Sequence, residues 1–172
     1  YKMLYNRREL KDVSKMTDKD YTPGGMTALL DAVGRTIHKM DMVAGIHRKD
    51  KGNKVLFVII TDGEENDSKE YTYADVKKLI KDRQENAGWE FIFLGANIDA
   101  AAAAENLGID RDRAVKYKNT GSGVRANFKA VAELSDSLAK SGRVSDRWKE
   151  TVEKDEDDAA DKQSAAVTSH RR

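Results

Sequence analysis

Apolar residues in this chain fall into short runs that are separated by longer polar segments. The first long run covers residues 55–60 without a polar interruption, and a second covers residues 89–95. Six residues is strand length, and four of the residues in the first run are β-branched. This favours a strand that is buried on both faces over a buried helix. We expect two core strands here and a short third one at residues 114–117.

Elsewhere, apolar residues recur at three- and four-residue steps, which is the spacing of amphipathic helices. The spacing predicts a first helix over residues 28–43, directly after a Pro-Gly-Gly turn. A second helix is predicted to begin at a capping box formed by Thr72 and Asp75 and to end near Gly88.

Two further helices are expected in the second half of the chain. An alanine-rich segment, residues 100–106, follows the capping residue Asp99 and is stopped by Gly108. The last helix follows Gly123. Its apolar side is predicted to consist of Val124, Phe128, Val131 and Leu138.

Both ends of the chain are expected to contribute little to the core. Residues 1–5 alternate like a short, half-exposed strand. Three apolar residues are spaced to pin the next segment onto the body: Leu10, Val13 and Met16. After Gly142 apolar residues become rare, and residues 149–172 are predicted to be a frayed helix followed by disorder. The expected domain therefore spans residues 1–141, with a polar tail at residues 142–172.

Strands and helices alternate along the chain, which predicts an α/β fold. We expect a three-layer, mostly parallel, doubly wound (Rossmann-like) sheet with helices on both faces. The 172 residues suit one domain.

Composition narrows the function classes. The 31 basic residues nearly cancel the 30 acidic ones, so neither nucleic acid nor a membrane surface is indicated as a partner. The chain has no cysteine, no apolar stretch near the ~20 residues needed to span a bilayer, and no recognisable signal peptide. We expect a cytoplasmic protein.

Two loops are predicted to meet at the carboxyl edge of the sheet, where ligands gather in open α/β folds. One carries Thr27 at a helix start, and the other carries Asp62 at the end of the strand at residues 55–60. Hydroxyl and carboxylate oxygens are ligands that Mg²⁺ prefers. The same residues would also serve simply as a helix cap and a turn.

Two segments resemble motifs of von Willebrand factor A domains. Tyr-Thr-Pro-Gly-Gly-Met-Thr-Ala-Leu-Leu-Asp-Ala at residues 21–32 is similar to the second motif of that family. Val-Leu-Phe-Val-Ile-Ile-Thr-Asp-Gly-Glu-Glu-Asn at residues 55–66 is similar to the third. Phe-Ile-Phe-Leu-Gly-Ala-Asn-Ile-Asp at residues 91–99 also resembles the bacterial and phage branch. The resemblance covers about residues 1–140.

The resemblance implies a metal-ion-dependent adhesion site at the carboxyl edge of a doubly wound sheet. Thr27 would be the second-motif ligand to Mg²⁺ or Mn²⁺, and Asp62 would be the third-motif carboxylate, bound directly or through water. A partner protein would offer an acidic side chain to the open metal position. The implied function is a protein-binding module without catalytic residues, not an enzyme.

The family's first motif, Asp-x-Ser-x-Ser, has no counterpart in this chain. Asp12-Val13-Ser14-Lys15 does not replace it, because Met16 stands where the second serine is required. The chain opens at Tyr1 with strand-like residues, so we expect a fragment that lacks the first strand and its motif. Such a chain would by itself supply only part of the metal ligands.

The main alternative is a Mg²⁺-dependent nucleotide-binding or phosphoryl-transfer protein. Residues 121–126 fit the Gly-x-Gly-x-x-Ala pattern of a dinucleotide-binding turn. However, no acidic strand end follows about twenty residues later, since Asp136 falls inside the expected last helix. A plain helix start explains the glycines more simply, and no catalytic group beyond the metal ligands is recognisable.

Overall fold

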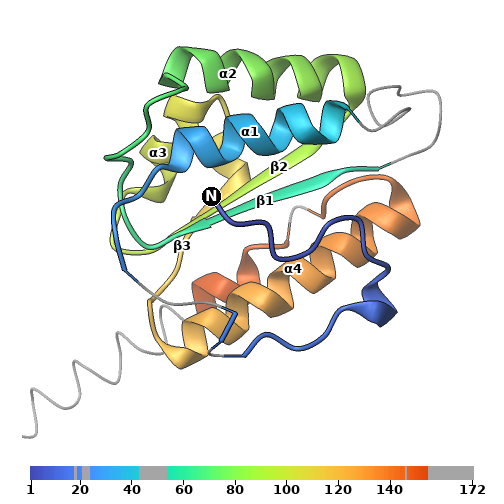
Figure 1. Cartoon of the computed structure of the whole chain (residues 1–172). Helices are drawn as coiled ribbons and strands as arrows, with labels where there is room; N and C mark the ends of the chain where they lie inside the picture. The colour runs from blue at the N-terminus through green and yellow to red at the C-terminus, as the bar shows by residue number, and fades with distance from the viewer. Residues whose placement is uncertain (18, 21–23, 43–53, 146, 155–172) are drawn as a thin grey trace, which may run out of the picture.

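The computed structural model describes residues 1–17, 19–20, 24–42, 54–145 and 147–154. Helices and strands alternate along this part of the chain (Figure 1). They are α1 (Leu29–Asp41), β1 (Leu56–Thr61), α2 (Tyr73–Asp82), β2 (Glu90–Gly95), α3 (Ala100–Leu107), β3 (Ala114–Lys116) and α4 (Gly121–Ser141). A π-helical turn, Arg83–Ala87, continues α2. The predicted order of elements is confirmed from α1 onward.

The three strands form one parallel sheet in the order β1-β2-β3. Thr61 at the end of β1 pairs with Gly95 of β2, and Gly95 pairs with Lys116 of β3. The carboxyl ends of all three strands therefore lie at one level. The predicted α/β class with a parallel sheet is confirmed.

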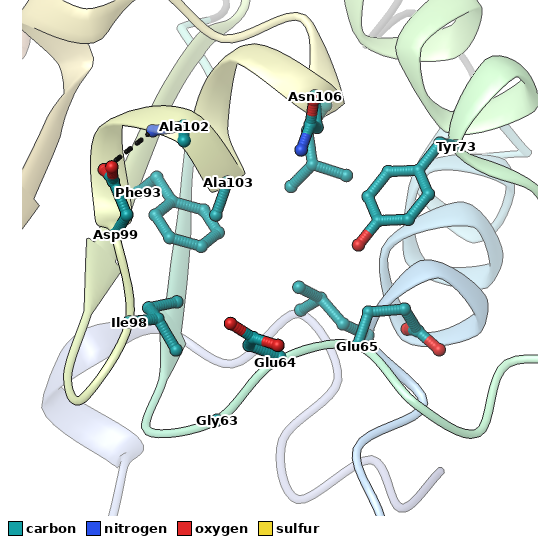
Figure 2. Close-up of a pocket in the computed structure, with 12 residues that line it drawn as sticks. Gly63, Glu64, Glu65, Tyr73, Phe93, Ile98, Asp99, Ala102, Ala103 and Asn106 are labelled. Atoms are coloured by element: carbon teal, nitrogen blue, oxygen red, sulfur yellow. Dashed lines mark hydrogen bonds between the residues drawn. The ribbon is translucent and has the colours of Figure 1, made fainter.

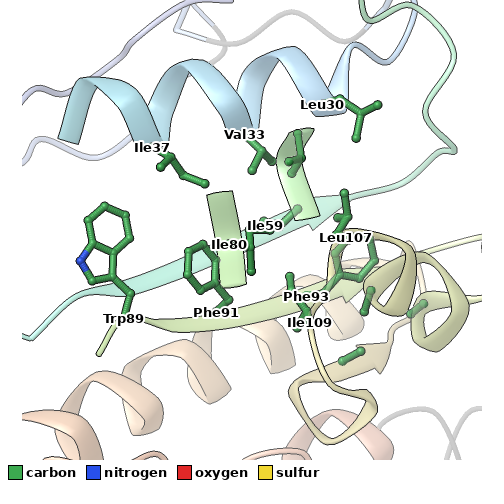
Figure 3. Packing of buried hydrophobic residues seen from close by; sticks show 14 of the residues in the cluster. Leu30, Val33, Ile37, Ile59, Ile80, Trp89, Phe91, Phe93, Leu107 and Ile109 are labelled. Carbon is green, nitrogen blue, oxygen red and sulfur yellow. The ribbon is translucent and has the colours of Figure 1, made fainter. Parts of the chain in front are cut away.

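Each face of the sheet packs against helices because the side chains of β2 alternate between them. Phe91 and Phe93 join residues of α1, α2 and α3 in one apolar cluster (Figure 3). Ile92 and Leu94 point the other way and join residues of α4 in a second cluster. Full burial of one such side chain contributes roughly 1.5–3 kcal/mol.

The expectation that the first apolar run is buried on both faces is wrong for β1. Only Ile59 and Thr61 of this strand are buried, and Ile60 is 44% exposed. The fully buried strand is β2, where all residues from Phe91 to Gly95 are buried. The reason is position, since β2 lies between two strands while β1 pairs with β2 alone in the described part of the chain.

The N-terminal segment does not form the predicted strand. Residues 1–5 have no strand assignment, Leu10 and Met16 are exposed, and only a short 3₁₀ turn, Leu10–Asp12, is present. Side-chain hydrogen bonds attach this segment instead. The Tyr1 hydroxyl lies 3.1 Å from the hydroxyl of Thr36 on α1.

The apolar side of α4 also differs from the prediction. Val124 and Phe128 are exposed, whereas Leu138 is buried and Val131 packs partly buried against the core, as expected. The buried side consists of Gly123, Ala126, Asn127, Ala130, Leu134 and Leu138. Small residues let the helix approach the sheet closely, so this side packs inward although it carries fewer large apolar residues.

Residues after Gly142 contribute more to the core than the sequence indicated. Val144, Trp148 and Val152 are all buried in the cluster that contains Ile92 and Leu94. The expectation that this region has almost nothing to bury is therefore wrong as far as residue 152. The disorder expected for residues 155–172 lies outside the described residues. No helix in the described ranges is long and apolar enough to cross a bilayer.

Candidate functional site

The structure brings Thr27 and the loop of Asp62 together at the carboxyl edge of the sheet. Asp62 directly follows the last residue of β1, and Thr27 lies two residues before α1. A Cβ atom built on Gly63 would lie 3.4 Å from Oγ1 of Thr27. The loop after β1 therefore passes directly against the threonine hydroxyl. The two loops meet at the carboxyl edge of the sheet, as the sequence predicts.

The backbone of Thr27 is held by the same loop. Its N–H donates to Oδ1 of Asn66 at 2.7 Å. Its carbonyl oxygen accepts hydrogen bonds from the backbone N–H groups of Asn66 at 3.0 Å and Asp67 at 3.3 Å. Both polar backbone groups of Thr27 are thus satisfied by the loop, which fixes the position of this residue relative to Asp62.

The N-terminus of α1 is capped from outside the helix. Ala28 occupies the N-cap position and provides no side-chain cap. Instead, the carboxylate of Glu65 accepts from the Leu30 N–H at 2.9 Å, and the Ser68 hydroxyl accepts from the Asp31 N–H at 3.1 Å. Thr27 is therefore not needed as the helix cap. A structural role as a cap does not explain why a threonine stands at this position.

The surroundings of Glu65 favour the ionised form of its carboxyl group. Burial alone would raise the pKa of its carboxyl group. Hydrogen bonds from the N–H groups of Leu30, Ser68 and Asp67 and from the Ser68 hydroxyl outweigh burial and lower the pKa. The resulting negative charge lies at the positive N-terminal end of α1, where it is stabilised further.

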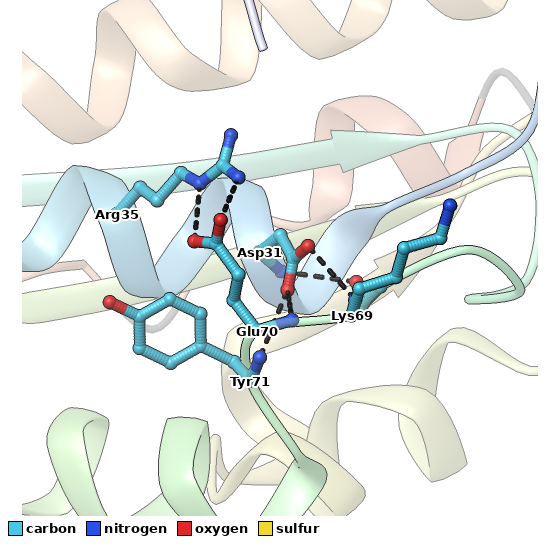
Figure 4. A network of polar contacts seen from close by, with 6 residues as sticks. Asp31, Arg35, Lys69, Glu70 and Tyr71 are labelled. Atoms are coloured by element: carbon cyan, nitrogen blue, oxygen red, sulfur yellow. Dashed lines mark hydrogen bonds and ion pairs between the residues drawn. The ribbon is translucent and has the colours of Figure 1, made fainter.

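A buried carboxylate, that of Asp31, also ties the loop to α1. Asp31 accepts hydrogen bonds from the backbone N–H groups of Lys69 at 3.0 Å, Glu70 at 2.9 Å and Tyr71 at 3.0 Å (Figure 4). The Lys69 hydrogen bond is the largest cause that holds the pKa of Asp31 below its ordinary value. Arg35 adds a two-pronged ion pair with Glu70. The loop is thereby anchored along the first two turns of the helix.

The turn at Asp62 does not use the Asp62 side chain. The buried Thr61 hydroxyl donates to the Gly63 carbonyl oxygen at 2.9 Å and accepts from the Gly63 N–H at 3.3 Å. Among the described residues, neither the exposed Asp62 carboxylate nor the Thr27 hydroxyl has a hydrogen bond or ion pair. The side-chain oxygens of both predicted ligands are therefore not occupied by any residue that the structure describes.

These oxygens fit a hard divalent cation in kind, since Mg²⁺ and Mn²⁺ prefer hydroxyl, carboxylate and water oxygens. They do not complete a site in number. In the described ranges, no group of three or more His, Cys, Asp or Glu side chains is arranged to hold a metal. Thr27 and Asp62 would thus provide part of a coordination sphere, and water or another chain would provide the rest.

Gly123, in the first turn of α4, is explained by local packing. The Thr120 hydroxyl accepts from the Gly123 N–H at 3.2 Å and so caps the helix. A Cβ atom on Gly123 would lie only 2.1 Å from the carbonyl oxygen of Lys118. The close approach of the Lys118 backbone therefore requires a glycine at this position. A phosphate-binding role is not needed to explain it.

Four residues that organise the site were not identified from the sequence: Asp31, Glu65, Asn66 and Ser68. Their residue types are those that hydrogen-bond to backbone N–H groups, which is the one indication the sequence offers. Their partners lie 35 to 40 positions away along the chain. A local pattern cannot show such pairs.

Comparison of the chain with protein-family models, with curated proteins and with solved structures gives no match. What the site does must therefore follow from its own residues.

Proposed function

We propose that this chain is a von Willebrand factor A-like domain that binds a protein partner through a divalent cation at Thr27 and Asp62. One observation carries the proposal. Among the described residues, the Thr27 hydroxyl and the Asp62 carboxylate have no hydrogen bond or ion pair, and the loop that carries Asp62 holds the backbone of Thr27 at the same sheet edge. The parallel sheet with helices on both faces supports the three-layer, doubly wound arrangement of that family.

The residues of the chain have distinct roles in this proposal. Asp62 supplies negative charge and Thr27 a neutral oxygen, so the protein neutralises only part of the charge of a divalent ion. The bound cation supplies an open coordination position for an acidic side chain of the partner. Asn66 holds Thr27 at the required place through the two hydrogen bonds to its backbone.

Binding is favoured over catalysis by how the neighbouring groups are used. The carboxylate of Glu65 accepts hydrogen bonds from the backbone N–H groups of Leu30, Asp67 and Ser68 and is not free to transfer protons. The alternative, a nucleotide-dependent protein, loses support because the turn at Gly123 is filled by its own backbone.

The proposal is tested with Mn²⁺ as the probe, by electron paramagnetic resonance titration of the free ion. Saturable binding is expected in the wild type, with at least a tenfold loss in Thr27→Ala and in Asp62→Asn. Asp110→Asn, which changes an exposed carboxylate between α3 and β3, is the matched control and should bind like the wild type. Equal Mn²⁺ binding by the wild type and Asp62→Asn, or none by the wild type, would overturn the proposal.

A further inference from the structure

A pocket of about 250 Å³ lies beside the candidate metal site (Figure 2). It is enclosed by the loop after β1, the first residue of α2 and the helix α3. Part of its lining is apolar and consists of Leu29, Phe93, Ile98, Ala103 and Leu107. Pockets for small molecules are typically about 300–1,000 Å³, so this one suits a single amino-acid side chain better than a nucleotide.

Three polar side chains of the lining converge on one space. Figure 2 shows the Glu64 carboxylate, the Tyr73 hydroxyl and the Asn106 amide pointing toward the same space. The Glu64 carboxylate has no hydrogen bond or ion pair with any residue that the structure describes. It is therefore available to a group that enters from outside.

The charged residues that line the pocket are all acidic. Three carboxylates line it, those of Glu64, Glu65 and Asp99, while none of the described lining residues is Lys, Arg or His. Hydrogen bonds to backbone N–H groups satisfy Glu65 and Asp99 without removing their charge. The pKa of Tyr73 is raised by burial and further by Glu65 and Glu64, as expected in a negative surrounding.

We propose that this pocket receives the cationic end of a lysine or arginine side chain of the partner protein. The long aliphatic stem of such a residue matches the apolar part of the lining, and its charged end matches the Glu64 carboxylate. A purely apolar side chain would gain no ion pair with Glu64, and an anionic one would be repelled.

This inference rests on the proposed function for the identity of the partner, and it makes that function more specific. Gly63 lines the pocket and also lies against the Thr27 hydroxyl. The pocket and the metal site therefore share one residue. A partner would present a basic residue next to the acidic residue that completes the metal.

The test uses n-butylguanidinium as the probe and its neutral analogue n-butylurea as the comparison, followed by ¹⁵N–¹H NMR in EDTA. We expect saturable shifts of the Gly63, Phe93 and Asn106 amides with the cation, and at least tenfold weaker binding of the urea. Glu64→Gln should weaken binding of the cation at least fivefold. Glu105→Gln, which removes an exposed carboxylate of α3 that does not line the pocket, is the matched control and should bind like the wild type.

Filling the pocket gives an independent check, because Ala103→Leu should abolish the shifts while leaving the fold intact by far-UV circular dichroism. Equal binding of both probes, or unchanged binding by Glu64→Gln, would overturn the inference. Since EDTA removes divalent cations, the result does not depend on Mn²⁺ binding, and failure of either proposal is seen separately.

Discussion

Replacement of Trp148 by alanine tests whether the residues after α4 belong to the cooperative fold. The Trp148 side chain is 2% exposed, and its ring N–H donates to the Asp112 carbonyl oxygen at 3.1 Å. A buried aromatic residue removes about 150–250 Å² from water, which at about 25 cal/mol/Å² is an upper limit of roughly 4–6 kcal/mol. Substitutions of this kind cost about 3–5 kcal/mol. We expect a loss of about 4 kcal/mol.

The assay is urea unfolding followed by far-UV circular dichroism, with the free energy of unfolding compared at constant m value. Trp148→Phe keeps one aromatic ring but loses the N–H donor, and its free energy of unfolding should fall by about 1–2 kcal/mol. This variant provides the test if the alanine variant does not fold. Arg147→Ala changes the exposed neighbour and should stay within about 0.5 kcal/mol. A loss below about 1 kcal/mol in Trp148→Ala would show that these residues do not belong to the core.

Two further predictions concern Glu65 at the candidate site and Gly123 in the first turn of α4. Because the pKa of Glu65 is lower in the folded chain than its unfolded value of about 4.3, its carboxylate stabilises the fold above that value, and this contribution is lost as the pH falls through the folded pKa. The difference in free energy of unfolding between wild type and Glu65→Gln, measured by urea titration from pH 7 to pH 3, should therefore be largest near pH 7 and shrink below about pH 5; a difference that does not change with pH would contradict this explanation. Gly123→Ala should cost about 2 kcal/mol or more in thermal unfolding, because its Cβ would lie 2.1 Å from the Lys118 carbonyl oxygen. The same substitution at Gly121 meets only the flexible end of Arg125 at 3.4 Å and should stay within about 0.5 kcal/mol, and equal effects at both positions would refute the packing argument.

Features of the fold that depend on neighbours in the sequence were predictable. The capping box of α2 forms as expected, with the Thr72 hydroxyl accepting from the Asp75 N–H and the Asp75 carboxylate accepting from the Thr72 N–H. Asp99 caps α3 through the Ala102 N–H, and Gly108 ends that helix in the left-handed conformation. Each of these interactions joins residues within one or two turns, so a local pattern contains all the information needed.

The candidate site was predictable in part. The rule that ligands gather at the carboxyl ends of parallel strands placed Thr27 and Asp62 together. The hydrogen bonds of Glu65, Asn66 and Asp31 were not predictable. They connect α1 and Thr27, just before it, to the loop after β1, and their partners lie 35 or more residues apart along the chain.

The sequence by itself determined the elements from α1 onward, their order and the α/β class, since hydrophobic period and turn residues act over a few positions. Only the tertiary structure decided which strand is central, which side of α4 is buried, and that Trp148 packs beneath the sheet. It also decided that Glu65, and not the Thr27 hydroxyl, caps α1. Burial and hydrogen-bond saturation are properties of the assembled chain, in which distant segments compete for the same surface and the same backbone N–H groups.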